Sequence, residues 1–243
     1  MTSNIQNQTN DIQIRWKPEI TTPQLILRPI EEGDLVSYEE LFANKVAMQK
    51  YLGGPRNIKD RFFRWIKRWD IHPYSALAVV DRVSKQVIGH MVLGHGDWEG
   101  DRANGWSEVA IVIHPNYWNY LKSNLKNDVG SAFKHHMGTE AIRAAVAYAK
   151  VLRERLEGVP CDVTEDQRAE VEEIAKNDSS FEVHRNEEGQ IDWVYLPLNE
   201  IRATAAHVNV AGHKILEKVF IEENGGTMKK KNPERDLFTI KLS

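Results

Sequence analysis

The sequence predicts a mixed α/β fold in which one mostly antiparallel sheet lies between helices. Three observations support this prediction. Strand-like runs separated by turns follow one another between residues 76 and 115, a long helix with a regular apolar face comes next, and a strand, a helix and a last strand close the chain. The chain has 243 residues and no long linker, so we expect a single domain over residues 21–243.

The composition is that of an ordinary globular protein, with 41% hydrophobic and 28% charged residues. A formal net charge of -3 gives no general attraction to nucleic acid or to anionic membranes, and no apolar run is long enough to span a membrane. The single cysteine, Cys161, excludes an intramolecular disulfide, and a plain thiol is favoured over a nucleophile because no histidine is close to it in sequence. We expect a cytoplasmic protein that binds neither nucleic acid nor membrane.

The first third of the chain predicts one strand and two helices. Residues 1–20 are polar at their start and are expected to be disordered or extended. A short strand follows between two prolines at residues 23–29. Asp34 can cap a helix that runs to about Tyr51, and an amphipathic helix at residues 59–69 comes after a Gly-Gly-Pro stop.

The middle of the chain predicts a three-stranded meander and then the clearest helix. The strands are residues 76–81, 86–93 and 106–115, and a glycine- and acid-rich loop at residues 94–105 joins the last two. The helix begins at Gly138, and Gly158 and Pro160 are expected to end it. Its buried face is predicted from apolar residues three or four apart: Ile142, Ala145, Ala149, Leu152 and Leu156.

The last third predicts a charged segment, a hairpin, and a strand–helix–strand ending. Thr164 and Gln167 have the spacing of a capping box, and residues 181–184 and 191–196 read as the two strands of the hairpin. A strand at residues 199–207, a helix from Asn209 and a strand at residues 237–242 follow. The Lys-Lys-Lys run at residues 229–231 is interpreted as a solvated turn in preference to a nucleic-acid patch.

The strand at residues 106–115 and the start of the next helix together predict an anion site. Backbone N–H groups at Met137-Gly138-Thr139 lack intrahelical partners, and such groups favour phosphate. The connecting residues 116–136 are longer and poorer in glycine than a phosphate loop usually is. We therefore interpret residues 116–136 as an insertion, and residues 157–197 as a second one.

Four stretches of the chain carry a resemblance to a known family. They are residues 22–29; residues 87–91 with the sequence Val-Ile-Gly-His-Met; residues 108–118 together with residues 138–141; and Ala203-Thr204-Ala205 with Asn209-Val210-Ala211 and Ile215-Leu216-Glu217-Lys218. In this order they resemble the GNAT superfamily of N-acetyltransferases, in the branch that includes the ribosomal-protein N-terminal acetyltransferases. The resemblance covers about two-thirds of the chain and rests on the order of the motifs.

The resemblance implies the GNAT fold, in which two parallel strands splay apart and hold the pantetheine arm of acetyl-CoA. Here these strands would be residues 109–113 and 201–205, and the backbone of Ile111, Val112 and Ile113 would bind the pantetheine amides. Met137, Gly138 and Thr139 would hold the pyrophosphate. The implied partners are acetyl-CoA and an amine acceptor, a protein N-terminus or a small molecule, which attacks the thioester directly.

The phosphate loop departs from the family pattern, because His136 stands where the family has a glycine. Lys134, His135 and His136 could contact the phosphates electrostatically, or they could form a surface loop without a specific role. A metal site is disfavoured because the histidines show neither HExxH spacing nor a cysteine partner.

Glu108 is the candidate general base, since members of the family place a glutamate near the acceptor amine. The alternative is a strand-edge glutamate in a surface salt bridge. The family's usual general acid is a tyrosine, and in some members a serine. The corresponding residues here are Leu216 and Gly212, so the acid is missing or another group supplies it. Asn209 could contact the cofactor amide or cap the helix.

Three further alternatives remain open. Trp65, Trp69, Trp98 and Trp106 could line a substrate pocket, although core packing is the more frequent role of such residues. The fold could have become a non-catalytic scaffold whose two insertions contact a partner, or it could take an acyl group longer than acetyl. The sequence leaves the oligomeric state open, a homodimer included.

Overall fold

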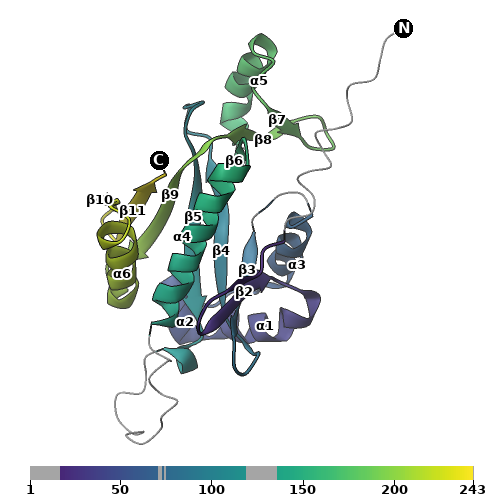
Figure 1. The fold of residues 1–243 in the computed structure, drawn as a ribbon. Coiled ribbons are helices and arrows are strands. Elements are labelled where there is room, and N and C mark those ends of the chain that lie inside the picture. Colours follow the sequence, from purple (N-terminus) through teal and green to yellow (C-terminus); the bar gives the residue numbers. More distant parts are fainter. Residues whose placement is uncertain (1–16, 71–72, 74, 119–135, 243) are drawn as a thin grey trace, which may run out of the picture. The chain divides into compact units, whose positions relative to one another are not determined.

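The computed structural model describes residues 17–70, 73, 75–118 and 136–242 (Figure 1). It divides into two compact units. The first consists of residues 1–93 and 110–144, and the second consists of residues 94–109 and 145–243. Strands β4 (Val87–Asp97) and β5 (Gly105–Ile113) and helix α4 (Met137–Arg155) each contribute residues to both units. The expectation of a single domain over residues 21–243 stays a prediction.

The first unit contains an antiparallel sheet. Strand β1 (Ile20–Thr21) pairs with β2 (Leu25–Pro29), β2 pairs with β3 (Ala76–Asp81), and β3 pairs with β4. All residues of β3 are buried, including Asp81 at its end, and the apolar run Ala76–Val80 is typical of a central strand. Strands β4 and β5 approach closely at Gly89, where an added Cβ would lie 2.5 Å from the carbonyl oxygen of Val112. Only glycine permits this approach.

Three helices of the first unit precede the meander: α1 (Leu35–Ala43), α2 (Lys45–Tyr51) and α3 (Lys59–Arg68). The prediction of one helix from Asp34 to Tyr51 is wrong. Asn44 has an extended backbone, with ψ of 110°, and its side chain accepts a hydrogen bond from the N–H of Ala47, so one helix ends there and another begins. Asp34 also does not cap α1 with its side chain, because its carboxylate accepts from Arg28 and from the N–H of Glu31.

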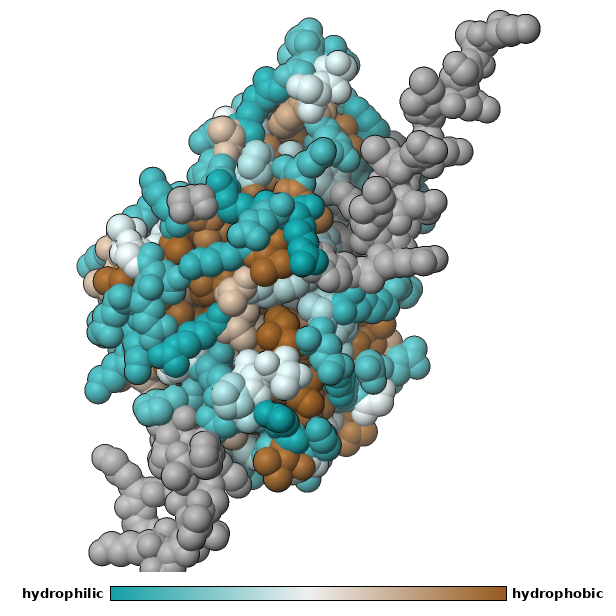
Figure 2. Space-filling model, viewed as in Figure 1, coloured by the Kyte–Doolittle hydropathy of each residue, from teal (hydrophilic) through white to brown (hydrophobic). Residues whose placement is uncertain are grey.

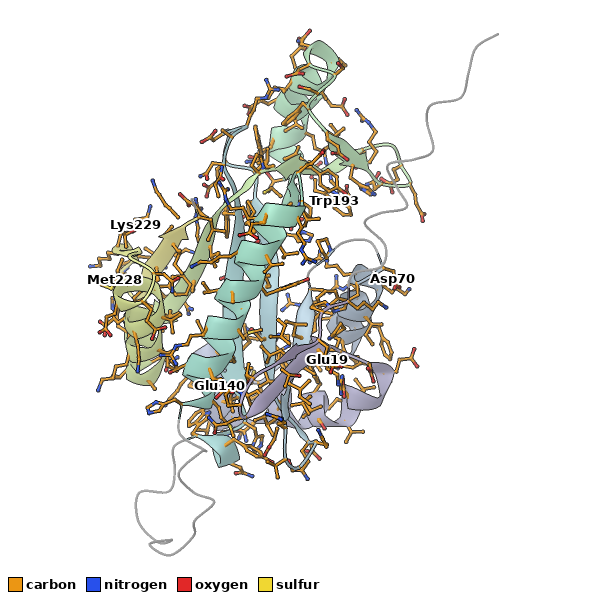
Figure 3. The ribbon with its side chains drawn as sticks, viewed as in Figure 1. Glu19, Asp70, Glu140, Trp193, Met228 and Lys229 are labelled. Carbon is orange, nitrogen blue, oxygen red and sulfur yellow. The ribbon has the colours of Figure 1, made fainter. Side chains whose placement is uncertain are left out.

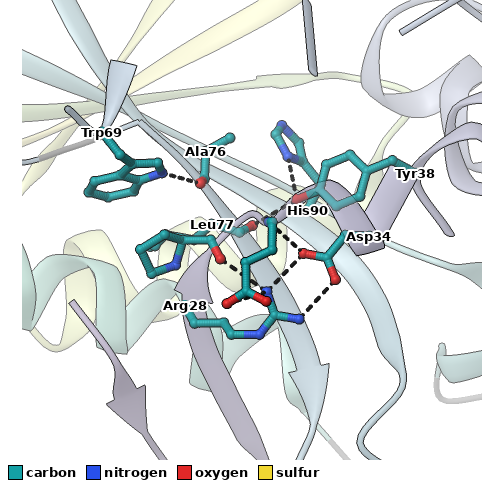
Figure 4. A network of polar contacts seen from close by, with 9 residues as sticks. Arg28, Asp34, Tyr38, Trp69, Ala76, Leu77 and His90 are labelled. Carbon is teal, nitrogen blue, oxygen red and sulfur yellow. Dashed lines mark hydrogen bonds and ion pairs between the residues drawn. The ribbon is translucent and has the colours of Figure 1, made fainter. Parts of the chain in front are cut away.

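The core between these helices and the sheet is aromatic and encloses a histidine. The His90 ring is fully buried, stacks on Trp65 at 4.5 Å between centroids, and lies 3.3 Å through Nδ1 from the Tyr38 hydroxyl (Figure 4). The Tyr38 hydroxyl donates to the carbonyl of Leu77, so Nδ1 of His90 is the donor to the hydroxyl oxygen. Nε2 then carries a lone pair without a hydrogen-bond partner among the described residues.

The second unit contains a parallel strand pair and a C-terminal hairpin. Strand β9 (Leu198–Ala206) runs parallel to β5 and antiparallel to β11 (Arg235–Lys241), which pairs with β10 (Thr227–Asn232). Helix α6 (Val210–Leu216) continues into a π-helical turn at Glu217–Glu222. The interpretation of Lys229–Lys231 as a turn is wrong, because these residues lie in β10. The side chains of β10 are exposed, and Figure 3 labels Met228 and Lys229 on it.

Residues 157–197 of the second unit form a small layer with its own core. The elements are β6 (Val159–Asp162), α5 (Arg168–Asn177), β7 (Val183–Arg185) and β8 (Ile191–Leu196), and Figure 1 shows α5 beside β7 and β8. The predicted capping box is confirmed at Thr164 and Gln167. The prediction that Pro160 ends the long helix is wrong, because α4 ends at Arg155 and Pro160 lies within β6, opposite Tyr195.

The single cysteine of the chain, Cys161, lies in the hydrophobic core of this layer. This core contains Trp98, Val163, Val171, Phe181, Ile191, Val194, Leu196 and Cys161. Burial raises the pKa of Cys161 to about 11, so the side chain is a protonated thiol at neutral pH and a poor nucleophile.

The surface is mainly hydrophilic on the face shown in Figure 2, with hydrophobic residues between the polar ones. The large hydrophobic side chains that are most exposed are distributed over distant parts of the sequence: Val36, Val46, Val83, Val208, Val210 and Met228. Single exposed residues of this kind are normal. Among the helices of the described residues, none combines the length and the apolar character needed to cross a membrane.

The buried His90 predicts a stability that depends on pH. Burial lowers the pKa of His90 from 6.5 to about 3, so the unfolded chain binds a proton at His90 between these values and the folded chain does not. The stabilisation is fully present above pH 6.5 and is lost as the pH falls towards 3. Relative to His90→Phe, the protein should lose about 2 kcal/mol of unfolding free energy between pH 7 and pH 5.

Urea unfolding of the two proteins at both pH values measures this difference. Other titrating groups are common to both proteins and cancel in the comparison. Equal pH dependence of the protein and of His90→Phe would mean that the imidazole is protonated inside the core.

Candidate functional site

The site is built around the end of the parallel pairing between β5 and β9. Beyond an irregularity at Gly105, the register aligns Trp106 with Glu200, Ser107 with Ile201, and Glu108 with Arg202. That pair is the last of the register, although β5 continues to Ile113 and β9 continues to Ala206. A strand that extends beyond its ladder has backbone N–H and C=O groups available for another partner.

Glu108 is half-buried at this point and has a perturbed acidity. Burial raises the pKa of its carboxyl group, Lys231 and Arg235 lower it, and Asp97 raises it. Among the described residues, Glu108 forms no ion pair within 4 Å, which argues against the surface salt bridge considered as the alternative. A carboxylate with a raised pKa, not neutralised by a partner, has the properties of a general base.

Two glycines of β4 shape the surroundings of this carboxylate. An added Cβ on Gly96 would lie 2.3 Å from the carbonyl oxygen of Trp106, so these two residues face each other on neighbouring strands. Gly89 approaches β5 closely at Val112 and Ile113. The two glycines therefore let β4 lie close to β5 on both sides of Glu108 along the strand. The sequence signal was a Gly-x-Gly within a strand, and it was interpreted as a loop.

The residue before α4 has an unusual backbone conformation. His136 has a φ of 81°, in the left-handed region that favours glycine. Its carbonyl accepts the N–H of Glu140, the first helical bond. Thr139 and Met137 are buried, and Gly138 is half-buried. Lys134 and His135 lie outside the described residues.

The first turn of α4 is anchored by its own acid. The carboxylate of Glu140, labelled in Figure 3, accepts hydrogen bonds of 2.8 Å from the backbone N–H and from the side-chain amide of Gln24. These bonds tie the helix start to the turn between β1 and β2, and a negative side chain in the first helical turn is stabilised by the helix dipole.

Asn209 has the helix-capping role that sequence reasoning considered. Its side-chain oxygen accepts from the N–H of Gly212 at 3.1 Å, and an added Cβ on Gly212 would lie 2.6 Å from the Asn209 amide nitrogen. A side chain at position 212 would therefore require the Asn209 amide to shift. A contact of Asn209 with a cofactor stays a prediction.

Leu216, where the resemblance led us to expect a tyrosine, is buried, and two histidines of the same unit lie beside a carboxylate. His207 Nε2 lies 3.2 Å from one carboxylate oxygen of Asp236, and His213 Nε2 lies 3.7 Å from the other. Sequence reasoning missed this group, because Asp236 comes from β11 and the histidines come from the end of β9 and from α6.

The tryptophans divide into core residues and one site residue. Trp69 and Trp98 are buried, so core packing is confirmed for them, and Trp65 packs against the buried cluster of the first unit. Trp106 is half-buried beside Arg202, whose guanidinium lies 4.5 Å from the ring centroid. In the described part of the chain, no group of three or more His, Cys, Asp or Glu side chains could hold a metal ion.

The sequence matches one family model. Residues 24–122 match the model described as an acetyltransferase (GNAT) domain, which is less than half of the chain. No curated protein matches the sequence.

Solved structures match over a longer range. One is a ribosomal-protein-S5-alanine acetyltransferase from Vibrio fischeri, with a TM-score of 0.53 and 12% identity, covering 93% of this chain and 97% of the other. Another is a GNAT-family acetyltransferase from Streptococcus pneumoniae, with a TM-score of 0.52 and 12% identity, covering 90% and 100%. A third is a spermidine N-acetyltransferase from Vibrio cholerae in complex with CoA and spermine, with a TM-score of 0.51 and 16% identity, covering 91% and 97%.

At these identities the structural likeness establishes the fold. In this chain the fold contains the antiparallel strands β1 to β4, the parallel pairing of β5 with β9, and helix α6 followed by the hairpin of β10 and β11. The chain has the GNAT fold, and its residues 24–122 carry the sequence match to a GNAT acetyltransferase domain.

Proposed function

We propose that the protein is an acetyl-CoA-dependent N-acetyltransferase acting on a primary amine. The observation that carries this proposal is the end of the β5–β9 register at Glu108, where a half-buried carboxylate with a raised pKa meets strand backbone that continues beyond its partner. Acetyl-CoA would supply the thioester. Glu108 would remove the proton that the amine loses as its nitrogen bonds to the acetyl carbon and the carbon–sulfur bond breaks.

The cofactor contacts follow the same geometry. Backbone groups of Ile111, Val112 and Ile113 are proposed to pair with the pantetheine amides as a further strand would. The N–H groups of Met137, Gly138 and Thr139 are proposed to bind the pyrophosphate at the helix start, with Asn209 near the pantetheine arm. The side chains of Lys134, His135 and His136 would add positive charge or hydrogen-bond donors to the same anion.

The missing tyrosine does not contradict this function. An alkyl thiol has a pKa of about 8.5, so a thiolate is an acceptable leaving group near neutral pH and requires less help from an acid than an alkoxide would. Catalysis would then depend on the base and on positioning.

The acceptor is proposed to be a protein N-terminus or a small primary amine. The related structures named above act on both kinds, one on a ribosomal protein and one on a polyamine by their descriptions. The likeness to the branch of ribosomal-protein N-terminal acetyltransferases is part of this proposal. A single domain and a cytoplasmic location, which suits the one reduced cysteine, belong to it as well. Screening peptides and amines with a readout of released CoA thiol tests the function directly.

Glu108→Gln should lower kcat about 100-fold or more, because general-base catalysis typically contributes 10²- to 10⁴-fold. The dissociation constant for acetyl-CoA, measured by calorimetry, should stay nearly unchanged, because the amide keeps the shape of the carboxylate.

The matched control for this substitution is Glu154→Gln, which alters an exposed glutamate of α4. An unchanged kcat in Glu108→Gln would sink the assignment of the base.

Lys231→Gln should move the acidic limb of the pH profile of kcat/KM to higher pH. Burial and the carboxylate of Asp97 on β4 raise the pKa of Glu108. The cations of Lys231 on β10 and Arg235 on β11 lower it. The base must be deprotonated to act, so activity falls as the pH drops through the pKa of Glu108. Removing a nearby cation raises this pKa. Lys231 is exposed, so the displacement should shrink in high salt, and a limb that does not move in low salt would contradict the role of Glu108.

His136→Gly should weaken acetyl-CoA binding only slightly, because glycine adopts the observed φ of 81° without strain and only the proposed imidazole contact is lost. His136→Val should weaken binding and lower the melting temperature, because a β-branched residue disfavours this conformation. Calorimetry with acetyl-CoA compares the two variants. Weak binding by His136→Gly alone would assign the phosphate contact to the imidazole and not to the backbone.

A further inference from the structure

Arg202 stands at the place where the two parallel strands part. Its backbone is paired with that of Glu108, the last pair of the β5–β9 register. A ladder this short gives few hydrogen bonds, so side-chain contacts must fix how far the strands stay together. The position of Glu108 depends on that limit, since it lies on the last paired residue of β5.

The Arg202 side chain joins three segments of the second unit. Its guanidinium nitrogens donate to both carboxylate oxygens of Glu99, at 2.6 and 2.9 Å, and Nε donates to Glu200 at 2.8 Å. The guanidinium carbon Cζ lies over the Trp106 ring, 4.5 Å from its centroid. Only 15% of the Arg202 side chain is exposed, and 14% of that of Glu200, whereas Glu99 faces water on one side with 46% exposed.

We propose that Arg202 is the positioning residue of the general base. By clamping Trp106 on β5 and Glu200 on β9, it holds the strands together as far as Glu108 and no further, which sets the carboxylate at the opening between them. This inference rests on the proposed function for its catalytic consequence. The strand clamp itself is a property of the fold.

The clamp continues into the layer formed by residues 157–197. Glu99 follows Trp98, which is buried in the core of that layer. The N–H of Trp98 donates to the carbonyl of Asp162 at 2.8 Å, and the side-chain amide of Gln167 donates to the carbonyl of Trp98 at 2.8 Å. The layer therefore orients the loop that presents Glu99 to Arg202. This gives the insertion a supporting role in the site.

Arg202 fixes the position of the Glu108 side chain and does not alter its pKa. Its charge is compensated by two carboxylates, those of Glu99 and Glu200. The charges that lower the pKa of Glu108 are those of Lys231 and Arg235. Position and acidity can thus be altered separately by different substitutions.

Arg202→Lys is the decisive variant, because it keeps the positive charge and loses the planar fork that binds two carboxylates and stacks on the ring. We expect kcat to fall about 10- to 100-fold, as for a catalytic group displaced by about 1 Å. The acidic limb of the pH profile and the affinity for acetyl-CoA should stay where they are in the unaltered protein. Lys231→Gln should do the reverse, moving the limb and leaving kcat at its optimum nearly unchanged.

Glu99→Gln tests the other end of the clamp, because the amide keeps the size of the carboxylate and loses its charge. It should lower kcat in the same direction as Arg202→Lys, and the double variant should lose less than the two single losses combined. Arg64→Met, which alters an exposed arginine of α3, is the matched control for the loss of an arginine.

Amide hydrogen exchange supplies a readout that does not depend on activity. Arg202→Lys should speed exchange at residues 106–108 and 200–202, where the two strands pair, and leave exchange in the hairpin of β10 and β11 unchanged. Unchanged exchange, unchanged kcat, or a moved acidic limb in Arg202→Lys would each overturn the proposal. If the unaltered protein released no CoA with any amine, the proposed function would fail, and the exchange experiment would still decide whether Arg202 holds the strands.

Discussion

The pairing of strands β5 and β9 ends at Glu108 and Arg202. Beyond these residues both strands continue, but they are not paired with each other. Backbone groups left without a partner cost free energy unless water or a ligand satisfies them, so such an opening persists only when surrounding contacts hold it. The Arg202 cluster and the glycines of β4 provide contacts of this kind. The carboxylate of Glu108, the continuing backbone of β5 and the proposed cofactor contacts all depend on that opening.

Elements whose pattern is local were predicted well from the sequence. The unbroken apolar run of β3, the apolar face of α4 and the capping box at Thr164 were recognised because the residues that cause them lie within a few positions of one another. The errors came from tertiary contacts. Pro160 is accommodated in β6 because it pairs only with Tyr195 of β8, while the pairing of β6 with β4 begins at the next residue, Cys161. The lysines of β10 form a strand because β11 pairs with them.

The resemblance to a family gave a prediction of the candidate site in outline. The detailed geometry of the site could not be predicted from the sequence. The left-handed backbone at His136 is a single-residue conformation that no pattern of side chains announces. The contact of Arg202 with Glu99 joins residues 103 positions apart, and nothing in either neighbourhood marks it. The raised pKa of Glu108 arises mainly from burial, which only the folded chain determines.

The layer of residues 157–197 begins and ends at one place, since Val159 and Leu196 are paired across β6 and β8. A segment whose two ends meet can be exchanged between proteins as a cassette without stretching the chain that receives it. One residue prevents a clean exchange here. Trp98 lies outside residues 157–197 and yet packs in the core of this layer. Residues 157–197 could therefore be transferred to another protein only together with a tryptophan at the corresponding position.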